Sequence, residues 1–260
     1  MTGTPKDAAR RRERLDRLLV ERGMAPTREK ARTLVLAGVV LVGEARVDKP
    51  GTQVSRNADI RVKGDACPYV SRGGLKIEAA LDEFAIDVTG LAALDVGAST
   101  GGFTDCLLKR GARRVYALDV GYGQFAWSLR TDPRVVIFEK TNIRYFDGTG
   151  IEDTIDIAVV DVSFISLRLV LPVVAGLVKK GGVILALVKP QFEAGKGEVG
   201  KGGVVKDPAV HMRVLDEVLA CARGLNLTNL RVCDSPITGP AGNREFFLTG
   251  ENGEKASVPP

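Results

Sequence analysis

The chain has few of the residues from which metal centres and disulfide frameworks are built. It contains four cysteines, none of them paired as Cys-x-x-Cys, and His211 is its only histidine. Structural zinc sites need clustered cysteine and histidine side chains, and disulfide-stabilised domains need a regular framework of cysteines. We therefore expect no metal and no disulfide, and a reducing compartment such as the cytoplasm as the setting.

Long apolar runs are also missing from the sequence. The longest, residues 169–178, contains Pro172 and falls short of the roughly 18 residues that a membrane-spanning helix needs. The first residues, 1–14, are charged, so we expect no secretory signal. Both absences argue against an integral membrane protein.

Positive charge is unevenly distributed along the 260 residues. Residues 1–65 hold 15 of the 37 Lys and Arg but only 9 of the 32 Asp and Glu, so the rest of the chain is close to neutral. A basic segment of this kind favours a polyanionic partner, either nucleic acid or an anionic membrane, although a solvated helix face is the plainer alternative. The length allows one large domain and a small one.

Two helices are expected within this basic segment. One begins at Arg11 and ends at Gly23, with Leu15, Leu18 and Leu19 at helical spacing. A second spans residues 28–37 after Thr27, which is placed as its N-cap. Cations in the first turns of a helix oppose its dipole, so we expect those of the second helix to face a phosphate backbone. The residues predicted to bind RNA are Arg11, Arg14, Arg17, Arg28, Lys30, Arg32 and Arg72.

The helices are followed by an expected strand at residues 39–42 and an extended stretch that passes Lys49-Pro50 and ends near residue 63. Together with Arg-Leu-Asp at 14–16, this pattern resembles the S4-type RNA-binding domain over residues 14–62. The resemblance implies a small α+β unit that presents a basic helical face to structured RNA. A scaffold that binds protein, or nothing, is the alternative.

A glycine loop follows a short apolar strand at residues 91–96. It reads Asp95-Val-Gly-Ala-Ser-Thr-Gly-Gly102 and leads into an expected helix at 103–110. The next strand, 114–120, carries Asp119 near its end, 22 residues after Gly97. That is the spacing at which a carboxylate meets a ribose hydroxyl pair. The loop lacks the Gly-x-Gly-x-x-Gly pattern that seats a pyrophosphate, so a nucleoside without phosphates is favoured.

This combination resembles the cofactor motif of S-adenosylmethionine (SAM) dependent methyltransferases. A structural glycine turn without ligand and a variant dinucleotide site are the alternatives. By analogy with such folds, the adenine should lie near residues 141–144. The residues predicted to bind the cofactor are Asp95, Gly97, Ala98, Ser99, Gly101, Gly102, Asp119, Asn142, Ile143 and Asp161.

Alternating strands and helices continue to residue 248, which predicts the fold class. We expect an α/β protein with a Rossmann-like mixed sheet and helices on both faces, preceded by the small RNA-binding domain. The expected boundaries are 1–64 for the RNA-binding domain, 65–71 for a linker and 72–260 for the methyltransferase domain.

Two charged residues fall at the ends of apolar strands expected at 155–162 and 183–188. Asp161 lies near the end of the first, and Lys189 directly follows the second. Ligands of open α/β sheets bind at the carboxyl ends of the strands, so these opposite charges are expected to flank the cofactor cleft. A purely structural ion pair is the alternative.

Over nearly its whole length the chain resembles the TlyA family of ribosomal RNA ribose 2′-O-methyltransferases, also called hemolysin A, whose catalytic domain is FtsJ-like. The resemblance rests on Ser71-Arg-Gly-Gly-Leu-Lys76, the glycine loop, Asp161-Val-Ser-Phe-Ile-Ser166, Leu187-Val-Lys-Pro-Gln-Phe192 and Gly242-Asn-Arg-Glu-Phe246. It implies a catalytic tetrad of Lys76, Asp161, Lys189 and Glu245, with ribosomal RNA or ribosomal subunits as substrate and cytidine as the expected target nucleotide.

Lys189 is the expected base for the ribose hydroxyl, with Asp161 orienting it and Glu245 positioning Lys76 or the ribose. Three other functions compete with this one: a non-catalytic RNA-binding or ribosome-assembly protein, a membrane-active hemolysin, and a base methyltransferase. Retention of the tetrad argues against a non-catalytic protein, and the lack of a spanning segment argues against a membrane-active hemolysin. A base methyltransferase should carry an Asn-Pro-Pro-Tyr-like or cysteine motif at residues 161–164, and neither is present. The oligomeric state, monomer or dimer, is left open.

Overall fold

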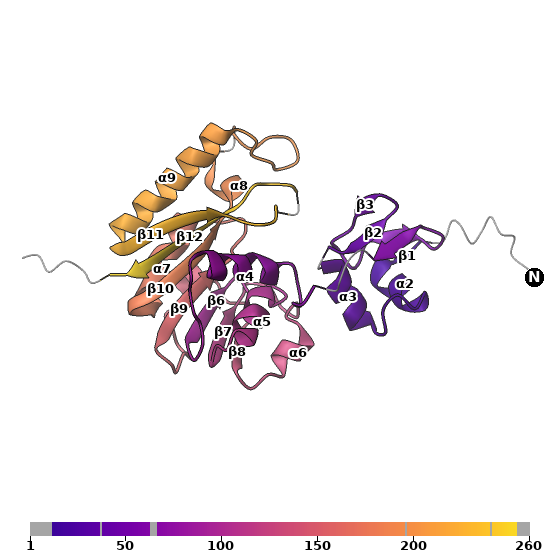
Figure 1. Ribbon diagram of the computed structural model, residues 1–260, viewed down its shortest axis with the longest axis horizontal. Helices are drawn as coiled ribbons and strands as arrows, with labels where there is room; N and C mark the ends of the chain where they lie inside the picture. The colour runs from indigo at the N-terminus through magenta and orange to yellow at the C-terminus, as the bar shows by residue number, and fades with distance from the viewer. Residues whose placement is uncertain (1–11, 37, 63–66, 196, 240, 254–260) are drawn as a thin grey trace, which may run out of the picture. The chain divides into compact units, whose positions relative to one another are not determined.

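A computed structural model describes residues 12–36, 38–62, 67–195, 197–239 and 241–253. The chain divides into two units, Met1–Leu75 and Lys76–Pro260, each with its own internal contacts (Figure 1). Within the described residues, no helix is long and apolar enough to cross a bilayer.

The first unit packs two helices on two small antiparallel sheets. Its elements are β1 (Arg12–Arg14), α2 (Leu15–Glu21), α3 (Arg28–Leu36), β2 (Val40–Val42), β3 (Ala45–Arg46), β4 (Gln53–Ser55) and β5 (Ile60–Val62). Strand β1 pairs with β4, and β2 lies between β3 and β5. Leu15, Leu19 and Val35 are fully buried in a common core. The α+β character expected from the sequence is confirmed.

The first helix begins later than expected. Arg12, Glu13 and Arg14 are extended and pair with Ser55, Val54 and Gln53 of β4. The apolar residues at helical spacing start only at Leu15, so the residues before it have no buried face to stabilise a helix. The second helix begins as predicted, because the hydroxyl oxygen of Thr27 accepts a hydrogen bond from the Lys30 amide at 3.1 Å.

The second unit contains a seven-stranded sheet and its helices. The strands are β6 (Ala92–Val96), β7 (Arg114–Leu118), β8 (Val135–Phe138), β9 (Ile155–Val160), β10 (Val178–Val188), β11 (Leu227–Asp234) and β12 (Phe246–Asn252). The helices are α4 (Gly73–Glu83), which begins in the first unit, α5 (Gly102–Lys109), α6 (Trp127–Arg130), the short 3-10 helix η1 (Ile143–Tyr145), α7 (Leu167–Leu177), α8 (Pro190–Glu193) and α9 (Pro208–Gly224).

The strand order is β11-β12-β10-β9-β6-β7-β8. Strands β10, β9, β6, β7 and β8 are parallel, whereas β12 runs antiparallel between β10 and β11. The mixed sheet predicted from the sequence is therefore confirmed. Because the parallel strands share one direction, the loops after β6, β7, β8, β9 and β10 gather at one edge, which we call the carboxyl edge.

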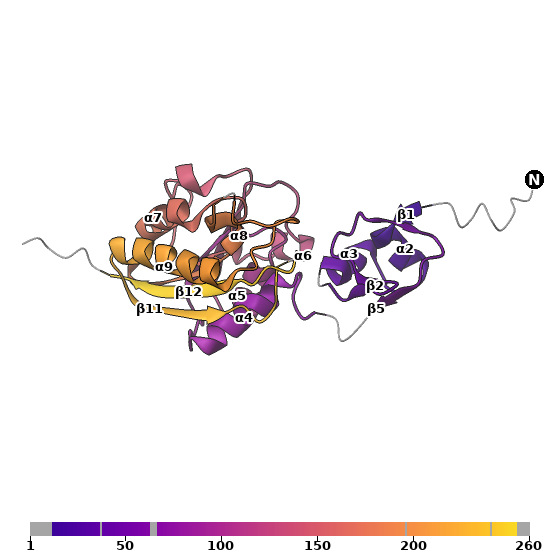
Figure 2. The same cartoon turned by 90° about the horizontal axis from the view of Figure 1, so that it is seen from above.

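Helices cover both faces of this sheet, as Figure 2 shows. Leu94, Val160 and Leu248 point to one face, where they join residues of α7 and α9 in one core. The opposite face receives α4 and α5, where the ring of Phe103 lies 6.3 Å from that of Phe247. Alternation of side chains along each strand divides the apolar residues between the two layers.

Several element boundaries differ from the expected ones. Strand β9 ends at Val160, so Asp161 lies just after it and not within it. Strand β10 begins at Val178 and not at residue 183, with an irregular register between Val178 and Val183. The short helix α8 was not expected. Such differences arise because tertiary contacts decide where a short element ends.

Candidate functional site

The glycine loop lies directly against the turn that follows β9. Gly97 has φ +88°, and a Cβ there would lie 2.4 Å from the carbonyl oxygen of Asp161. The Asp161 amide in turn donates a hydrogen bond to the Val96 carbonyl at 2.8 Å. Only glycine fits at this position, because both the left-handed backbone and the close approach exclude a side chain. The predicted cofactor loop and Asp161 are thus joined through their backbones.

A second glycine of the loop is equally confined. Gly101 has φ +96° and precedes α5, and a Cβ there would lie 2.5 Å from a methyl group of Leu129 and 3.0 Å from the ring of Phe125. Gly102 is the buried first residue of α5. The loop is therefore bounded on one side by β9 and on the other by the segment around α6.

Asp119 follows β7 and faces the glycine loop. Its two carboxylate oxygens accept hydrogen bonds from the amides of Ser99 at 2.8 Å and Gly121 at 2.6 Å. A small cavity opens here, lined by Ala98, Ser99, Ala117, Asp119, Gly121, Gln124, Phe125, Ile137 and Glu139. The structure thus brings together Ala98, Ser99 and Asp119, as the cofactor prediction requires. A half-buried carboxylate beside a glycine loop fits the ribose of a nucleoside cofactor.

Six residues that line this cavity were not among the predicted cofactor contacts: Ala117, Gly121, Gln124, Phe125, Ile137 and Glu139. The signal for Gln124 and Phe125 was the loop Gly121-Tyr-Gly-Gln124 after the second strand, at the same sheet edge as the glycine loop. Glu139 directly follows β8, forms an ion pair with Arg130, and accepts a hydrogen bond from the Gly123 amide at 2.8 Å. The sequence signal for Glu139 was a charged residue at the end of the strand that follows the Asp119 strand, at the same edge of the sheet.

Asp95 is fully buried near the end of β6, where the glycine loop begins. The Thr104 hydroxyl donates a hydrogen bond to it at 2.6 Å, and among the described residues its other oxygen has no partner. Burial raises the pKa of this carboxyl to about 7. Asp95 therefore connects β6 to α5, and it does not line the cavity.

The structure does not bring the predicted adenine contacts into the cavity. Ile143 is buried in the core that β6, β7 and α7 share, and the Asn142 side chain accepts a hydrogen bond from the Arg144 amide at 3.0 Å. Neither residue lines the cavity beside Asp119. Their contact with an adenine stays a prediction.

The four residues of the expected tetrad form two ion pairs. The Lys189 ammonium lies 2.5 Å from a carboxylate oxygen of Asp161, and it also donates to the Ser163 hydroxyl at 3.0 Å. Lys76 of α4 pairs with Glu245, and both side chains are nearly inaccessible to solvent. A buried lysine without a carboxylate partner would be costly, so each pair stabilises the charges of its members.

The sheet explains why these residues meet at the carboxyl edge. Asp161 directly follows β9, and Lys189 directly follows its parallel neighbour β10. Strand β12 runs the other way and pairs Phe246 with Val188, so Glu245 enters the sheet beside the point where Lys189 leaves it. The glycine loop lies at the end of β6, the other neighbour of β9.

An exposed aromatic ring, that of Phe164, packs on the half-buried ring of Phe192 beside Lys189, and this contact was not predicted. Phe164 is 91% exposed with φ +63°, and its ring centroid lies 4.9 Å from that of Phe192. The Lys189 ammonium is 5.9 Å from the Phe192 ring centroid. Phe164 thus holds an exposed ring beside Lys189 in a left-handed backbone conformation that a bulky side chain disfavours. The sequence signal for Phe164 was an apolar aromatic residue in the turn that follows the strand expected at 155–162.

In the first unit, two predicted RNA-binding arginines are held by one buried carboxylate. Arg14 and Arg28 reach Asp16, which is fully buried, at 2.9 and 3.0 Å. Although burial opposes it, hydrogen bonds from both arginines lower the pKa of Asp16. Each guanidinium keeps an exposed side, so Asp16 fixes two cations at the surface.

The other predicted RNA-binding residues are placed as follows. Arg17 lies 3.9 Å from Glu13, and Arg72 lies 3.7 Å from Asp48. Lys30 and Arg32 are exposed on α3, and Arg11 lies outside the described residues.

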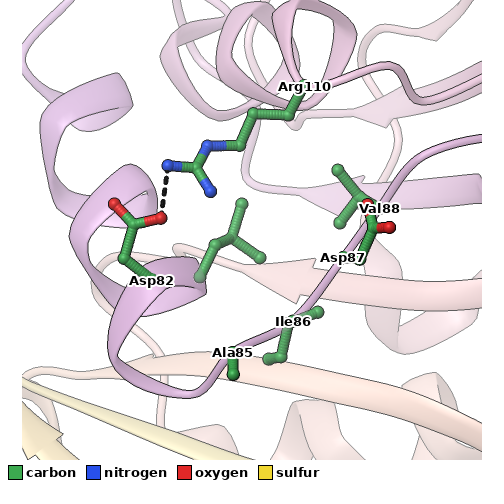
Figure 3. A pocket seen from close by; sticks show the side chains of 7 residues that line it. Asp82, Ala85, Ile86, Asp87, Val88 and Arg110 are labelled. Carbon is green, nitrogen blue, oxygen red and sulfur yellow. Dashed lines mark hydrogen bonds and ion pairs between the residues drawn. The ribbon is translucent and has the colours of Figure 1, made fainter.

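The second unit has another cavity away from the carboxyl edge, which Figure 3 shows. It is lined by Leu81, Asp82, Ala85, Ile86, Asp87, Val88 and Arg110. Leu81 and Asp82 belong to the last turn of α4, residues 85–88 connect α4 to β6, and Arg110 directly follows α5, so the cavity lies at the amino ends of the strands. Arg110 donates a hydrogen bond to Asp82 at 2.6 Å. Ligands of open α/β sheets bind at the opposite edge, so this cavity does not compete as the cofactor site.

Comparison with known proteins agrees with this geometry. The S4 domain model matches residues 13–60, and the FtsJ-like methyltransferase model matches residues 69–252. The chain is 50% identical to the "Putative rRNA methyltransferase YqxC" of Bacillus subtilis, over 96% of this chain and 90% of that protein. It is 49% identical to the 16S/23S rRNA (cytidine-2′-O)-methyltransferase TlyA of Mycobacterium tuberculosis, over 92% of this chain and 89% of that protein.

A solved structure, the "Putative hemolysin from Streptococcus thermophilus", superposes with a TM-score of 0.75 and 43% identity, covering 95% of this chain and 92% of that one. The likeness extends through both units, and the methyltransferase model alone covers more than half of the chain. With an S4 domain in front, this chain belongs to the FtsJ-like methyltransferase family.

Proposed function

We propose that this chain transfers a methyl group from SAM to the ribose 2′-hydroxyl of a cytidine in ribosomal RNA, in the cytoplasm. The observation that carries the proposal is the Lys189–Asp161 ion pair, which lies at the carboxyl edge beside the glycine loop. The relative from Mycobacterium tuberculosis bears the name of this reaction, and the chain matches it over nearly its whole length.

Residues around the cavity would hold the cofactor. Asp119 would accept hydrogen bonds from its ribose hydroxyls, while Gly97, Ala98, Ser99, Gly101 and Gly102 supply backbone without side chains in the way. Asp95 would support the loop from below through Thr104. When bound, SAM supplies a methyl group as a sulfonium electrophile, which the ribose oxygen attacks.

Lys189 is the proposed base for this reaction. A ribose hydroxyl is a weak acid and a poor nucleophile, so a base within hydrogen-bond reach favours the attack. The Lys189 ammonium would first release a proton to solvent. Nζ would then accept the hydroxyl proton as the ribose oxygen takes the methyl group, and the ammonium that forms again would be stabilised by Asp161 and Ser163, which contact it in the structure. Glu245 holds Lys76 near the end of β10, where the cation favours an oxygen that is losing its proton.

The first unit would supply affinity for RNA. Lys30 and Arg32 are exposed on α3, and Asp16 holds Arg14 and Arg28 beside them in the same unit. Phosphate contacts of this kind make affinity depend on salt, and the slope of that dependence falls by about 0.7–0.9 for each phosphate that is no longer neutralised. Replacing Lys30 and Arg32 together with alanine should flatten the dependence of RNA binding on salt, and an unchanged slope would contradict the assignment.

The test of the reaction uses labelled SAM with ribosomal subunits, followed by digestion to nucleosides and mass spectrometry. We expect a methylated ribose, at which alkali fails to cleave the RNA. Lys189→Ala should lower turnover by about 10²–10⁴ while SAM binding stays nearly intact. A methylated base, or no transfer to subunits or naked rRNA, would overturn the proposal.

Lys179→Ala is the matched control. Lys179 also belongs to β10 and also pairs with an aspartate next to it in the sheet, Asp156 of β9, at 2.6 Å. This pair lies at the opposite ends of the same two strands, away from the cofactor loop. Its loss removes a lysine–aspartate pair without touching the site, so turnover should stay within about twofold of the unmodified chain.

A further inference from the structure

A third charged group, Glu193, connects the two segments that carry Lys189 and Asp161. Glu193 is the last residue of α8, and its side chain is only 2% exposed. One carboxylate oxygen accepts a hydrogen bond from the Ser166 hydroxyl at 2.5 Å, and the other from the Leu167 amide at 2.6 Å. Ser166 and Leu167 begin α7, at the end of the turn that starts with Asp161.

The turn and α8 meet at three points in sequence order. Lys189 contacts Asp161 and Ser163, Phe192 contacts Phe164, and Glu193 contacts Ser166 and Leu167. The first two contacts are partly exposed to solvent, and only the third is buried. A charge-assisted bond to each carboxylate oxygen makes it the most directional of the three.

Burial of the Glu193 carboxylate costs free energy, so packing alone does not explain a glutamate at this position. Burial raises the pKa of Glu193, although Ser166, Leu167 and Arg168 act in the opposite direction. Other charged or titratable groups around it are Glu217 and Cys221 of α9. An apolar residue would fill the space without this cost, but it would leave the first amide of α7 without a partner.

We propose that Glu193 is a positioning residue for methyl transfer: by clamping the start of α7 to α8, it sets the distance between the Asp161 turn and Lys189. The proposal rests on the base role of Lys189 proposed above. The pairing of β9 with β10 and the Lys189–Asp161 contact also hold the two segments, but Glu193 alone fixes the far end of the turn to the last residue of α8. Release of this clamp lets the turn shift relative to Lys189 while the glycine loop stays in place against β9 and α5. A shift of about 1 Å in a reacting group costs about 100-fold in rate.

The experiment compares three variants by single-turnover methyl transfer to ribosomal RNA at saturating SAM, from about pH 6 to 10. Glu193→Ala removes both hydrogen bonds and should lower the rate about 10- to 100-fold, with the SAM Kd within about twofold of the unmodified chain. Glu193→Gln should recover most of the rate, because its amide oxygen can accept from Leu167 while its NH2 group donates to the Ser166 oxygen. Glu217→Ala, which removes a carboxylate on the other side of Arg168, is the control and should leave the rate unchanged.

The pH profile separates positioning from a purely structural role. If Glu193 acts through Lys189, the limb of the profile that reports this base moves in Glu193→Ala. A general loss of folded protein would instead lower the rate equally at every pH. An unchanged rate and profile in folded Glu193→Ala would overturn the proposal.

Should Glu193→Ala fail to fold, Ser166→Ala carries the test, since it removes one of the two donors. A lower rate below its melting temperature, with SAM affinity retained, supports the clamp, and an unchanged rate overturns it. The role of Lys189 is judged separately: a fully active Lys189→Ala sinks the proposed base, whereas an inactive Lys189→Ala beside a fully active Glu193→Ala sinks only the clamp.

Discussion

Replacing Gly97 with alanine tests whether the cofactor loop and the Asp161 turn depend on direct backbone contact. A Cβ at this position would lie 2.4 Å from the Asp161 carbonyl oxygen, about 1 Å inside an ordinary contact, and the residue has φ +88°. The left-handed conformation costs an alanine about 1–2 kcal/mol. Relieving the overlap costs about a further 1–3 kcal/mol, because backbone on both sides has to move.

Gly90→Ala is the matched control, because Gly90 lies before the same strand, has φ +74°, and has open space where a Cβ would be. Gly90→Ala should lose only the about 1–2 kcal/mol of folding stability that the left-handed conformation costs an alanine. In a domain of this size each kcal/mol corresponds to about 2–4 °C, so Gly97→Ala should melt about 2–12 °C lower than Gly90→Ala.

Activity should separate the two variants more clearly than stability. Displacing Asp161 by about 1 Å should lower the rate of methyl transfer about 100-fold in Gly97→Ala, measured below both melting temperatures. Gly90→Ala should retain its rate, since it lies at the amino end of β6. Equal melting temperatures and equal rates for the two variants would refute the reasoning.

Three further predictions concern individual carboxylates. Asp119→Ala removes a charge-assisted acceptor and should weaken SAM binding by about 1.5–3 kcal/mol, or about 10- to 150-fold in Kd, measured by calorimetric titration; an unchanged Kd would place the cofactor elsewhere. Asp95, whose pKa burial raises from 3.8 to about 7, favours the folded state when protonated, so folding stability should fall as pH rises from about 4 to 7. Asp95→Asn should remove this slope in urea denaturation across that range, and an identical slope in both proteins would contradict it. Asp16, whose pKa is lowered, stabilises the first unit fully above its ordinary value of 3.8, and this stabilisation is lost as pH falls through the lower folded value. Asp16→Asn should therefore be less stable at neutral pH and lose less on acidification, as denaturation monitored at several pH values would show.

Much of the architecture follows from periodicity that the sequence displays openly. The apolar strands at 92–96 and 155–160 were predictable, because burial on both faces leaves a continuous apolar run in the sequence. The order of the strands is another matter. Nothing local in residues 246–252 shows that this strand lies between β10 and β11, since that position depends on contacts far apart in the chain.

The site was predictable to the extent that its residues are charged or glycine at strand ends. Asp161 and Lys189 stand out because a charge that ends a buried strand needs a partner, and the structure pairs them. Phe164 and Glu193 do not stand out. A phenylalanine in a turn is common in sequences, and only its exposure in the structure distinguishes Phe164. A glutamate in a short helix is equally common, and only its burial distinguishes Glu193.

The Lys76–Glu245 pair joins residues that are 169 positions apart in the chain. Lys76 is the first residue of the second unit to be made, whereas Glu245 immediately precedes β12, the last strand of the described part of the chain. That strand must enter between β10 and β11, so the edge strand has no place in the sheet until it arrives. A chain that has not been made as far as Glu245 therefore lacks both the carboxylate that pairs with Lys76 and the strand that joins β11 to the sheet.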